Sequence, residues 1–561
     1  MPADVRSSNR SPLPSSGTRI NNTASHLPDG AMFAPGLLSP EPSAGQSPGA
    51  YLDRAPQACR QCSRLKRKCQ RELPFCSLCA RLGKTCQYPT RRKTYGSRTS
   101  DEDQSTSSAV LVGSAPSSNN AASPFPDAFF IDVELFRSVA HSTLRSAYPV
   151  PAQVSQLLGL DSNAVCEPYF NSVDKWFPFI SKKGLNLSIQ ANLPAETPGL
   201  ALLLLCMKLA SDPPQPYHTS AVESTLYRTA KSYLNTIEEV SPASLHVFQA
   251  LVLIALYEYG HGIFPAAYLT VGRAARLGVL RGIHDRKNST QLFVGPPTWT
   301  YNEEERRTWW ATCINLGPTG LPLATPEPAR GNLLPTIDEE WSRGEIGPNQ
   351  ALFMTGFSPE STIGPFARVC QTSHILGRVI NHKNYRKDSQ NWEFILDEAL
   401  QLNTTLSALD SYVSQPMEAR QENETVATVD VALCISARLA LYHMYACNEP
   451  DVLAPRRAEE TQMQAECIVG IKQIIATRSP ALARCVIQQG AENLDRSSPL
   501  VIQSLYDAAT ECQWFLREGD VVEGAGTTLR LLMGALNLLA QRWGLAGKYN
   551  PDVDFSESDD H

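Results

Sequence analysis

Six cysteines lie within one short stretch of this 561-residue chain, CRQCSRLKRKCQRELPFCSLCARLGKTC (Cys59–Cys86). The stretch contains two repeats, each a Cys-x2-Cys pair followed, after six intervening residues, by a third cysteine. Each repeat therefore supplies three thiolates, one fewer than the four ligands of a tetrahedral zinc ion. Two zinc ions need eight ligand positions, which six thiolates fill when two of the sulfurs are shared. The six cysteines are Cys59, Cys62, Cys69, Cys76, Cys79 and Cys86.

The symmetry of the repeat favours its two first cysteines, Cys59 and Cys76, as the shared ligands. We therefore predict a cofactor of two Zn²⁺ ions held by all six thiolates. The alternative is a disulfide knot, but such knots belong to secreted chains. The residues after Met1 do not form a signal peptide, which would have a charged segment followed by an apolar one.

Metal binding must also supply the folding free energy of this segment. About forty residues cannot bury enough apolar surface to fold alone, and a metal that binds only the folded state stabilises that state. Few sizeable apolar side chains lie nearby, and these are Leu65, Leu73, Phe75, Leu78 and Leu82.

Basic residues are concentrated in and after this stretch. The segment from Cys59 to Arg98 has a charge of +11, from twelve Lys or Arg and one acidic residue, whereas the whole chain has a charge of −6 and the remainder therefore −17. A short cationic module on an acidic protein is typical of a tethered domain that binds nucleic-acid phosphates. The basic residues beside the cysteines are Arg60, Arg64, Lys66, Arg67, Lys68 and Arg71.

The cysteine stretch resembles the fungal zinc binuclear cluster (Zn₂Cys₆) DNA-binding domain. The resemblance implies that the first of two short helices points its C-terminal end into the major groove of DNA. By position, Lys66 matches the family's base-reading lysine and Lys68 an almost invariant basic residue. Because lysine suits the O6 and N7 acceptors of guanine, a CGG-type half-site is expected. Ser63 departs from the Arg or Lys that the family often has.

The remaining basic side chains fit a different role. Arg64, Arg67 and Arg71 are expected to contact phosphates, which position a domain on DNA without reading its sequence. The alternative for any one of them is a solvated surface charge. Together with the run Arg91–Lys93, these clusters are also compatible with import into the nucleus.

The composition predicts five segments. Residues 1–55, rich in Ser, Pro, Gly and Asn, are expected to be a disordered N-terminal segment, and residues 56–98 the DNA-binding domain. Residues 99–125 are expected to be a flexible linker, residues 126–545 an all-α regulatory domain and residues 546–561 an acidic tail. No heptad repeat occurs between Gln87 and Pro124, so the sequence leaves open whether the chain forms a homodimer.

Helical patterns dominate the region after residue 125, and alternating strand patterns are nearly absent. Ser241-Pro242 is a helix-start signal, and the apolar run Val247–Tyr257 is expected to be buried. Glu303–Glu305 are expected at a helix start, where the helix dipole favours acids. Further helices are expected over 265–280, 365–382, 392–412, 426–446, 458–477, 499–517 and 527–543. The predicted fold class is mostly α, and no apolar run reaches the eighteen residues that a membrane helix needs.

Four segments of this region resemble the middle regulatory domain of the same fungal family, which implies a helical, solenoid-like bundle that restrains or transmits activation. They are YFNSVDKWFPFI (Tyr169–Ile180), AAYLTVGRAARLGVLRGIH (Ala266–His284), EEERRTWWA (Glu303–Ala311) and PLATPEPARGNLLPTIDEEW (Pro322–Trp341). The chain departs from the family after Trp310, where a helical turn or more is missing.

The sequence does not favour an enzyme. It contains no HExxH, GxxxxGK[ST] or GxSxG motif, and the nine other cysteines are scattered through helical apolar patterns. We interpret His284 as a capping or core residue rather than a ligand, and Trp309 and Trp310 as core rather than as the wall of an effector pocket. The acidic residues around Phe555 are compatible with an activation segment or with a frayed tail.

These observations predict a nuclear, non-enzymatic transcription factor that binds double-stranded DNA and the transcription machinery. Analogy with proteins of similar layout favours a regulator of a secondary-metabolite gene cluster. Two alternatives remain, namely a zinc-knot scaffold that binds protein, and a ligand sensor whose catalytic helical domain is anchored to DNA.

Overall fold

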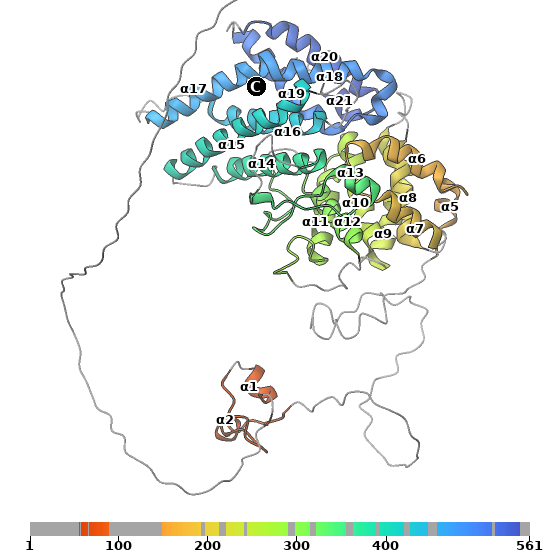
Figure 1. The fold of residues 1–561 in the computed structure, drawn as a ribbon, viewed down its shortest axis with the longest axis vertical. Helices are drawn as coiled ribbons and strands as arrows, with labels where there is room; N and C mark the ends of the chain where they lie inside the picture. Colours follow the sequence, from red (N-terminus) through yellow and green to blue (C-terminus); the bar gives the residue numbers. More distant parts are fainter. Residues whose placement is uncertain are drawn as a thin grey trace, which may run out of the picture. The chain divides into compact units, whose positions relative to one another are not determined.

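The computed structural model forms two compact units, one within Met1–Pro116 and one within Ser117–His561. Figure 1 draws the helices of both units as coiled ribbons. The residues that the structure describes are 55, 58–64, 67–88, 149–191, 197–212, 220–240, 244–289, 298–314, 321–354, 363–386, 392–419, 427–446, 457–518 and 522–549. The predicted linker, the residues before Ala55 and the region around Phe555 lie outside this set.

The first unit has two short helices and no apolar core among its described residues. Helix α1 (Arg60–Arg64) and helix α2 (Ser77–Arg81) each begin directly after the first cysteine of a repeat. Three expected apolar anchors are exposed, Leu73 and Leu82 to 44% and Phe75 to 62%. Apart from Ala55, the buried side chains among the described residues are cysteines, against which Leu78 and Tyr88 pack. The interior of this unit is therefore made of sulfur, as expected of a domain that folds around metal.

The second unit is helical, which confirms the predicted mostly-α fold class. Its described residues contain no strand, and Leu333 and Ala351 form an isolated β-bridge. The helices are α5 (Ala152–Leu158), α6 (Asn163–Asn171), α7 (Lys182–Ala191), α8 (Pro198–Ser211), α9 (Thr225–Val240), α10 (Leu245–Gly260), α11 (Ala266–Leu280), α12 (Trp299–Cys313), α13 (Asp338–Arg343), α14 (Pro365–Arg386), α15 (Trp392–Ala419), α16 (Ala427–Ala446), α17 (Ala458–Gln473), α18 (Ser479–Gln489), α19 (Ile502–Glu518), α20 (Ala525–Ala540) and α21 (Gly544–Lys548). None of the described helices combines the length and the apolar composition that crossing a bilayer requires.

Helices α8 and α10 form the centre of the first half of this unit, where they pack against each other. Helix α10 is buried over nearly its whole length, which confirms the expectation for Val247–Tyr257. Its N-cap residue is Ser244; the predicted start signal, Ser241-Pro242, lies outside the described residues. A helix that is apolar on all faces is stable only inside a protein.

The second half of this unit begins at α14. The chain passes through α14–α16 and then through α17–α20 (Figure 1). The last of them return to the first half, because Trp543 packs on Gly260 of α10 and Arg542 donates a 2.8 Å hydrogen bond to the Ala210 carbonyl of α8. The helix expected over 458–477 continues as a π-helical turn, Ile474–Arg478, directly into α18. The sequence patterns did not predict α18.

Three consecutive acids of α12, Glu303 to Glu305, lie in the core rather than at the helix start. The expectation was wrong because α12 begins four residues earlier, at Trp299, with the Thr298 hydroxyl accepting a 3.2 Å hydrogen bond from the Tyr301 N–H. All three acids are buried. Buried carboxylates require partners, and here those partners come from distant segments.

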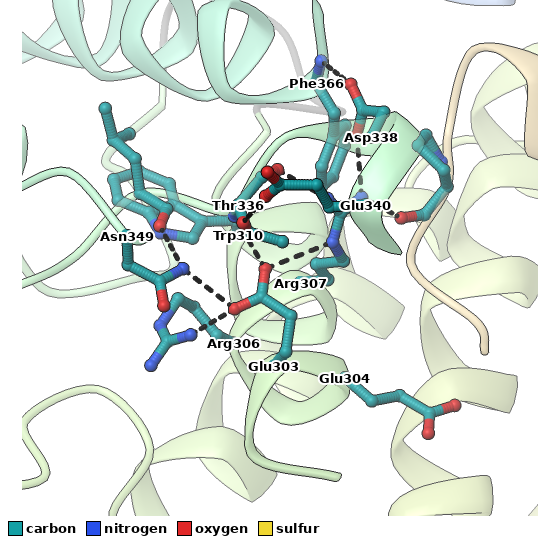
Figure 2. Close-up of polar contacts among 12 residues, drawn as sticks. Glu303, Glu304, Arg306, Arg307, Trp310, Thr336, Asp338, Glu340, Asn349 and Phe366 are labelled. Carbon is teal, nitrogen blue, oxygen red and sulfur yellow. Dashed lines mark hydrogen bonds and ion pairs between the residues drawn. The ribbon is translucent and has the colours of Figure 1, made fainter. Parts of the chain in front are cut away.

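Arg307 is the centre of the resulting polar network (Figure 2). Its Nε donates to Glu303, one helical turn earlier in α12, at 3.2 Å. Its two terminal nitrogens donate to the Pro178 carbonyl at 2.9 Å, to Asp338 at 2.8 Å and to the Thr336 carbonyl at 2.7 Å. One fully buried guanidinium thus joins α12 to the segments before α7 and around α13.

Glu304 forms a separate contact on the other side of α12. It accepts hydrogen bonds from the Ser181 N–H at 3.0 Å and from Gln249 Nε2 at 2.9 Å. Burial raises the pKa of Glu304 to about 7, although these two donors favour the carboxylate. Glu304 therefore ties α12 to α10 and to the N-terminus of α7.

Close packing of α11 on α12 gives a direct test of this fold. A Cβ atom added to Gly278 would lie 2.5 Å from the Trp309 ring, whereas one added to Gly272 of the same helix would meet nothing within 4 Å. Gly278→Ala should therefore destabilise the chain by about 1–3 kcal/mol. Gly272→Ala should leave stability unchanged or raise it by up to about 1 kcal/mol. The measurement is the thermal unfolding midpoint by circular dichroism, and equal midpoints for the two variants would contradict this packing.

Candidate zinc and DNA-binding site

The sulfur atoms of the cysteine stretch lie at the separations expected around zinc. Cys59 Sγ is 3.7 Å from Cys76 Sγ and 3.6 Å from Cys79 Sγ. Cys62 Sγ is 3.6 Å from Cys76 Sγ. Zinc–sulfur bonds of about 2.3 Å in a regular tetrahedron place the sulfurs about 3.8 Å apart. The residues therefore fit a zinc–thiolate cluster.

The six cysteines fall into two groups of four that share two members. One group is Cys59, Cys62, Cys69 and Cys76, the other is Cys59, Cys76, Cys79 and Cys86, and the potential ligand atoms of each group lie within 4.8 Å of one another. Each group matches the four ligands of one tetrahedral ion. The geometry brings all six sequence-predicted ligands together, with the two first cysteines in both groups.

The two shared cysteines also occupy equivalent places in the backbone. Cys59 Sγ accepts a 3.4 Å hydrogen bond from the Cys62 N–H just before α1. Cys76 Sγ accepts the same bond, also 3.4 Å, from the Cys79 N–H and is the N-cap of α2. A thiolate is stabilised at a helix N-terminus, where free N–H groups point outward. The internal repeat of the sequence therefore appears in the structure as two equivalent helix starts.

The surroundings of the thiols explain why they need a cation. Burial raises the pKa of Cys62 far above its usual value and that of Cys79 to about 12. Burial also opposes ionisation of Cys59 and Cys76, but the hydrogen bonds that they accept outweigh it and lower the pKa of both. Metal ligation requires thiolates, so divalent ions would stabilise the charged form at all six positions.

The predicted DNA-contacting side chains surround this cluster on the surface. The five described ones, Arg60, Arg64, Arg67, Lys68 and Arg71, are all exposed. Arg64 ends α1, and Arg71 adopts a left-handed backbone conformation with φ of 63°. Lys66, the predicted base reader, lies outside the described residues.

Two residues that the sequence reasoning did not single out hold the turn between the repeats. The Glu72 carboxylate accepts a 2.9 Å hydrogen bond from the Ser77 N–H at the start of α2. The Tyr88 hydroxyl donates a 2.6 Å hydrogen bond to the Glu72 carbonyl. The peptide bond between Leu73 and Pro74 is cis. An acidic residue shortly before a helix start is a weak signal that could have indicated the role of Glu72.

Two protein-family models match the chain. The model of the fungal Zn(2)-Cys(6) binuclear cluster domain matches residues 57–95, and that of the fungal specific transcription factor domain matches residues 167–313. The first match contains the six clustered cysteines and the basic residues beside them. The second runs from within α6 to the end of α12 and includes the Glu303–Arg307 pair.

Several curated proteins are similar over longer stretches. Transcription factor BOA15 of Botryotinia fuckeliana is 37% identical over 180 residues, which cover 32% of this chain and 98% of that protein. The azaphilone cluster-specific transcription factor azaR of Aspergillus niger is 24% identical over 58% of this chain and 72% of its own length. The citrinin biosynthesis transcriptional activator mrl3 of Monascus ruber is 23% identical over 59% of this chain and 73% of its own length. No solved structure is significantly similar to the chain.

The zinc content of cysteine variants tests the sharing of sulfurs. Cys59 belongs to both four-sulfur groups and Cys69 to only one. Cys59→Ser should therefore remove most of the zinc from the full-length chain, whereas Cys69→Ser should lower the content from about two ions toward one. Cys485→Ser, in α18 of the helical unit, serves as a matched control and should keep two ions. The measurement is zinc per chain by mass spectrometry, and a larger loss in Cys69→Ser than in Cys59→Ser would contradict the sharing.

Proposed function

The chain belongs to the fungal Zn(2)-Cys(6) transcription factors, and from that premise we propose that its DNA-binding domain reads CGG-type half-sites. The observation that carries this proposal is the pair of four-sulfur groups that share Cys59 and Cys76, next to exposed basic residues. Its cofactor is zinc, as two ions. Zinc shapes the basic segment, and the segment supplies the charge that a DNA duplex attracts.

Each residue of the site has a proposed role. All six clustered cysteines are zinc ligands, with Cys59 and Cys76 bridging the two ions. Lys66 reads guanine in the major groove. The other basic side chains contact phosphates and position α1 on the duplex; these are Arg60, Arg64, Arg67, Lys68 and Arg71. Their exposure and the end of α1 at Arg64 support this assignment.

The proposed domain organisation keeps the boundaries expected from the composition. Residues 1–55 form the N-terminal segment, 56–98 the DNA-binding domain, 99–125 the linker, 126–545 the regulatory domain and 546–561 the acidic tail. The division of the chain into two compact units supports a linker between two domains. The two family models match within 56–98 and within 126–545, which supports the same division.

The names of the relatives favour a biosynthetic gene cluster as the regulated target. The relative from Aspergillus niger is named for an azaphilone cluster and that from Monascus ruber for citrinin biosynthesis. Because the similarity covers more than two thirds of both proteins, we place this chain in the same functional class. We further propose that it acts in the nucleus with the transcription machinery, as a monomer or a homodimer, and that its helical unit regulates rather than catalyses.

Removing the base-reading lysine tests sequence recognition. Lys66→Ala in the full-length chain should reduce discrimination between CGG-containing and scrambled duplexes by about 1–3 kcal/mol, because a lysine contact with guanine is lost. Zinc content should stay at the wild-type value. The measurement is fluorescence anisotropy at fixed salt concentration. Unchanged discrimination would show that another residue reads the base.

A matched pair of arginines tests the phosphate contacts. Arg64 ends α1 and Arg81 ends α2, so both close an equivalent helix of the repeat. Arg64→Ala should weaken binding to every duplex alike and lower the slope of log K against log salt by roughly one unit. Arg81→Ala, in the second repeat, should leave the slope unchanged. A loss confined to one DNA sequence, or an equal effect of both variants, would contradict the proposed role.

A further inference from the structure

A cavity of about 510 Å³ lies inside the helical unit, between the segment from α6 to α7 on one side and α13 with the start of α14 on the other. Its volume is within the range of sites that bind small molecules. Its walls come from segments that are more than 150 residues apart in the sequence. The lining combines aromatic residues and prolines with three lysines and three acids, Asp174, Asp338 and Glu339.

Asp174 is the unusual residue of this lining. It lies in the short 3-10 helix Val173–Lys175 and is partly exposed on the cavity wall. Its Oδ1 is shielded from solvent and has no hydrogen-bond partner in the described part of the chain, so a ligand reaches the carboxyl group at its other oxygen. Burial raises the pKa of Asp174 to about 7, although Arg307 and Lys175 favour its charged form. This carboxyl group is therefore divided between its neutral and charged states near neutral pH.

A hydroxyl group is the ligand group that best matches such a carboxyl group. It can donate to the carboxylate and accept from the protonated acid, so it suits both states. An ammonium group is disfavoured because three cations, Arg307, Lys175 and Lys182, already act on Asp174, against one acid, Asp338. A neutral hydroxyl group therefore fits Asp174 better than an ammonium group does.

Three lysines, Lys175, Lys182 and Lys183, give the rim of the cavity a positive charge. Lys182 is only weakly neutralised, because its 3.4 Å ion pair with Glu167 is more than half exposed on both sides. Among the acids of α13 that line the cavity, Asp338 already accepts hydrogen bonds from Arg307 and from the Phe366 N–H, whereas Glu339 is exposed, so the three lysines outnumber the one acid whose charge is not offset. The rim therefore favours a ligand with an anionic group.

The walls between the carboxyl group and the lysines are apolar. Phe170 and Trp341 are buried aromatic residues on opposite sides, and Pro178, Ile180 and Pro365 complete the surface. Lys182 Nζ lies 5.3 Å from the centre of the Phe170 ring. Flat apolar walls of this kind suit an aromatic body.

We propose that this cavity binds a small hydroxylated aromatic carboxylic acid, with its hydroxyl on Asp174, its ring between Phe170 and Trp341 and its carboxylate on the lysines. The inference concerns the helical unit alone and does not depend on how the chain reads DNA. Arg307 donates a hydrogen bond to the Pro178 carbonyl on one wall. On the other wall it bonds to Asp338 (Figure 2). A ligand that bridges the two walls would therefore act on the same segments that Arg307 joins.

The test uses three probes on the full-length, zinc-loaded chain. The first is 6-hydroxy-2-naphthoate, the second is 2-naphthoate, which lacks the hydroxyl, and the third is 2-naphthol, which lacks the carboxylate. Isothermal titration calorimetry at neutral pH should show saturable binding of 6-hydroxy-2-naphthoate at one site, about tenfold tighter than either analogue. Equal affinities for the three probes, or no binding of the first at millimolar concentration, would overturn the proposal.

Substitutions of lining residues test whether the probes bind in this cavity. Asp174→Asn, which preserves shape, should weaken 6-hydroxy-2-naphthoate about tenfold and leave 2-naphthoate unchanged. The double variant Lys182→Ala/Lys183→Ala changes only exposed side chains and should weaken both naphthoates but not 2-naphthol. Lys287→Ala, an exposed lysine outside the cavity, should change none of the affinities. If the cavity variants bind like the wild type while their thermal midpoints match it, the site lies elsewhere.

Discussion

Six thiolates confined within a few ångströms constrain everything else in the DNA-binding unit. Their sulfurs lie in two sets whose potential ligand atoms are within 4.8 Å of one another, and the unit has no apolar core among its described residues. Negative charges at such distances repel each other unless cations lie among them. Two zinc ions remove that repulsion and replace the missing core at the same time. The exposed arginines and lysines therefore depend on the metal for a fixed arrangement, and sequence recognition depends on that arrangement.

The helical unit is held by a different kind of interaction. Arg307 and the acids of α12 bring together segments that are distant along the chain, with apolar helices α8 and α10 beside them. A buried guanidinium with several oxygen partners is costly to disturb, since removing one partner leaves a charge without compensation. The cavity at Asp174 adjoins this network. The regulatory role that we propose for this unit needs a place where a signal can alter the packing, and we propose the segments joined by Arg307 for that role.

The sequence predicted the features whose residues lie close together along the chain. Cysteine spacing alone indicated two zinc ions and shared sulfurs, because ligand geometry allows few other arrangements. The burial of Val247–Tyr257 followed from its composition. Glu303 to Glu305 were predicted at a helix start, whereas they lie buried in the core. Their partners include Ser181, more than 120 residues away, and a local sequence pattern does not report such a contact. The cavity was not predicted for the same reason, because Asp174 and Trp341 come together only through tertiary packing.

The central claim is that two zinc ions share sulfur ligands within Cys59–Cys86. X-ray absorption spectroscopy at the zinc edge of the full-length chain tests it most directly, because the spectrum reports the neighbours of each ion. The expected result is four sulfur neighbours per zinc at about 2.3 Å, together with a zinc–zinc scattering path that bridging sulfurs produce. Nitrogen or oxygen in place of sulfur, or sulfur ligands without a zinc–zinc path, would contradict it.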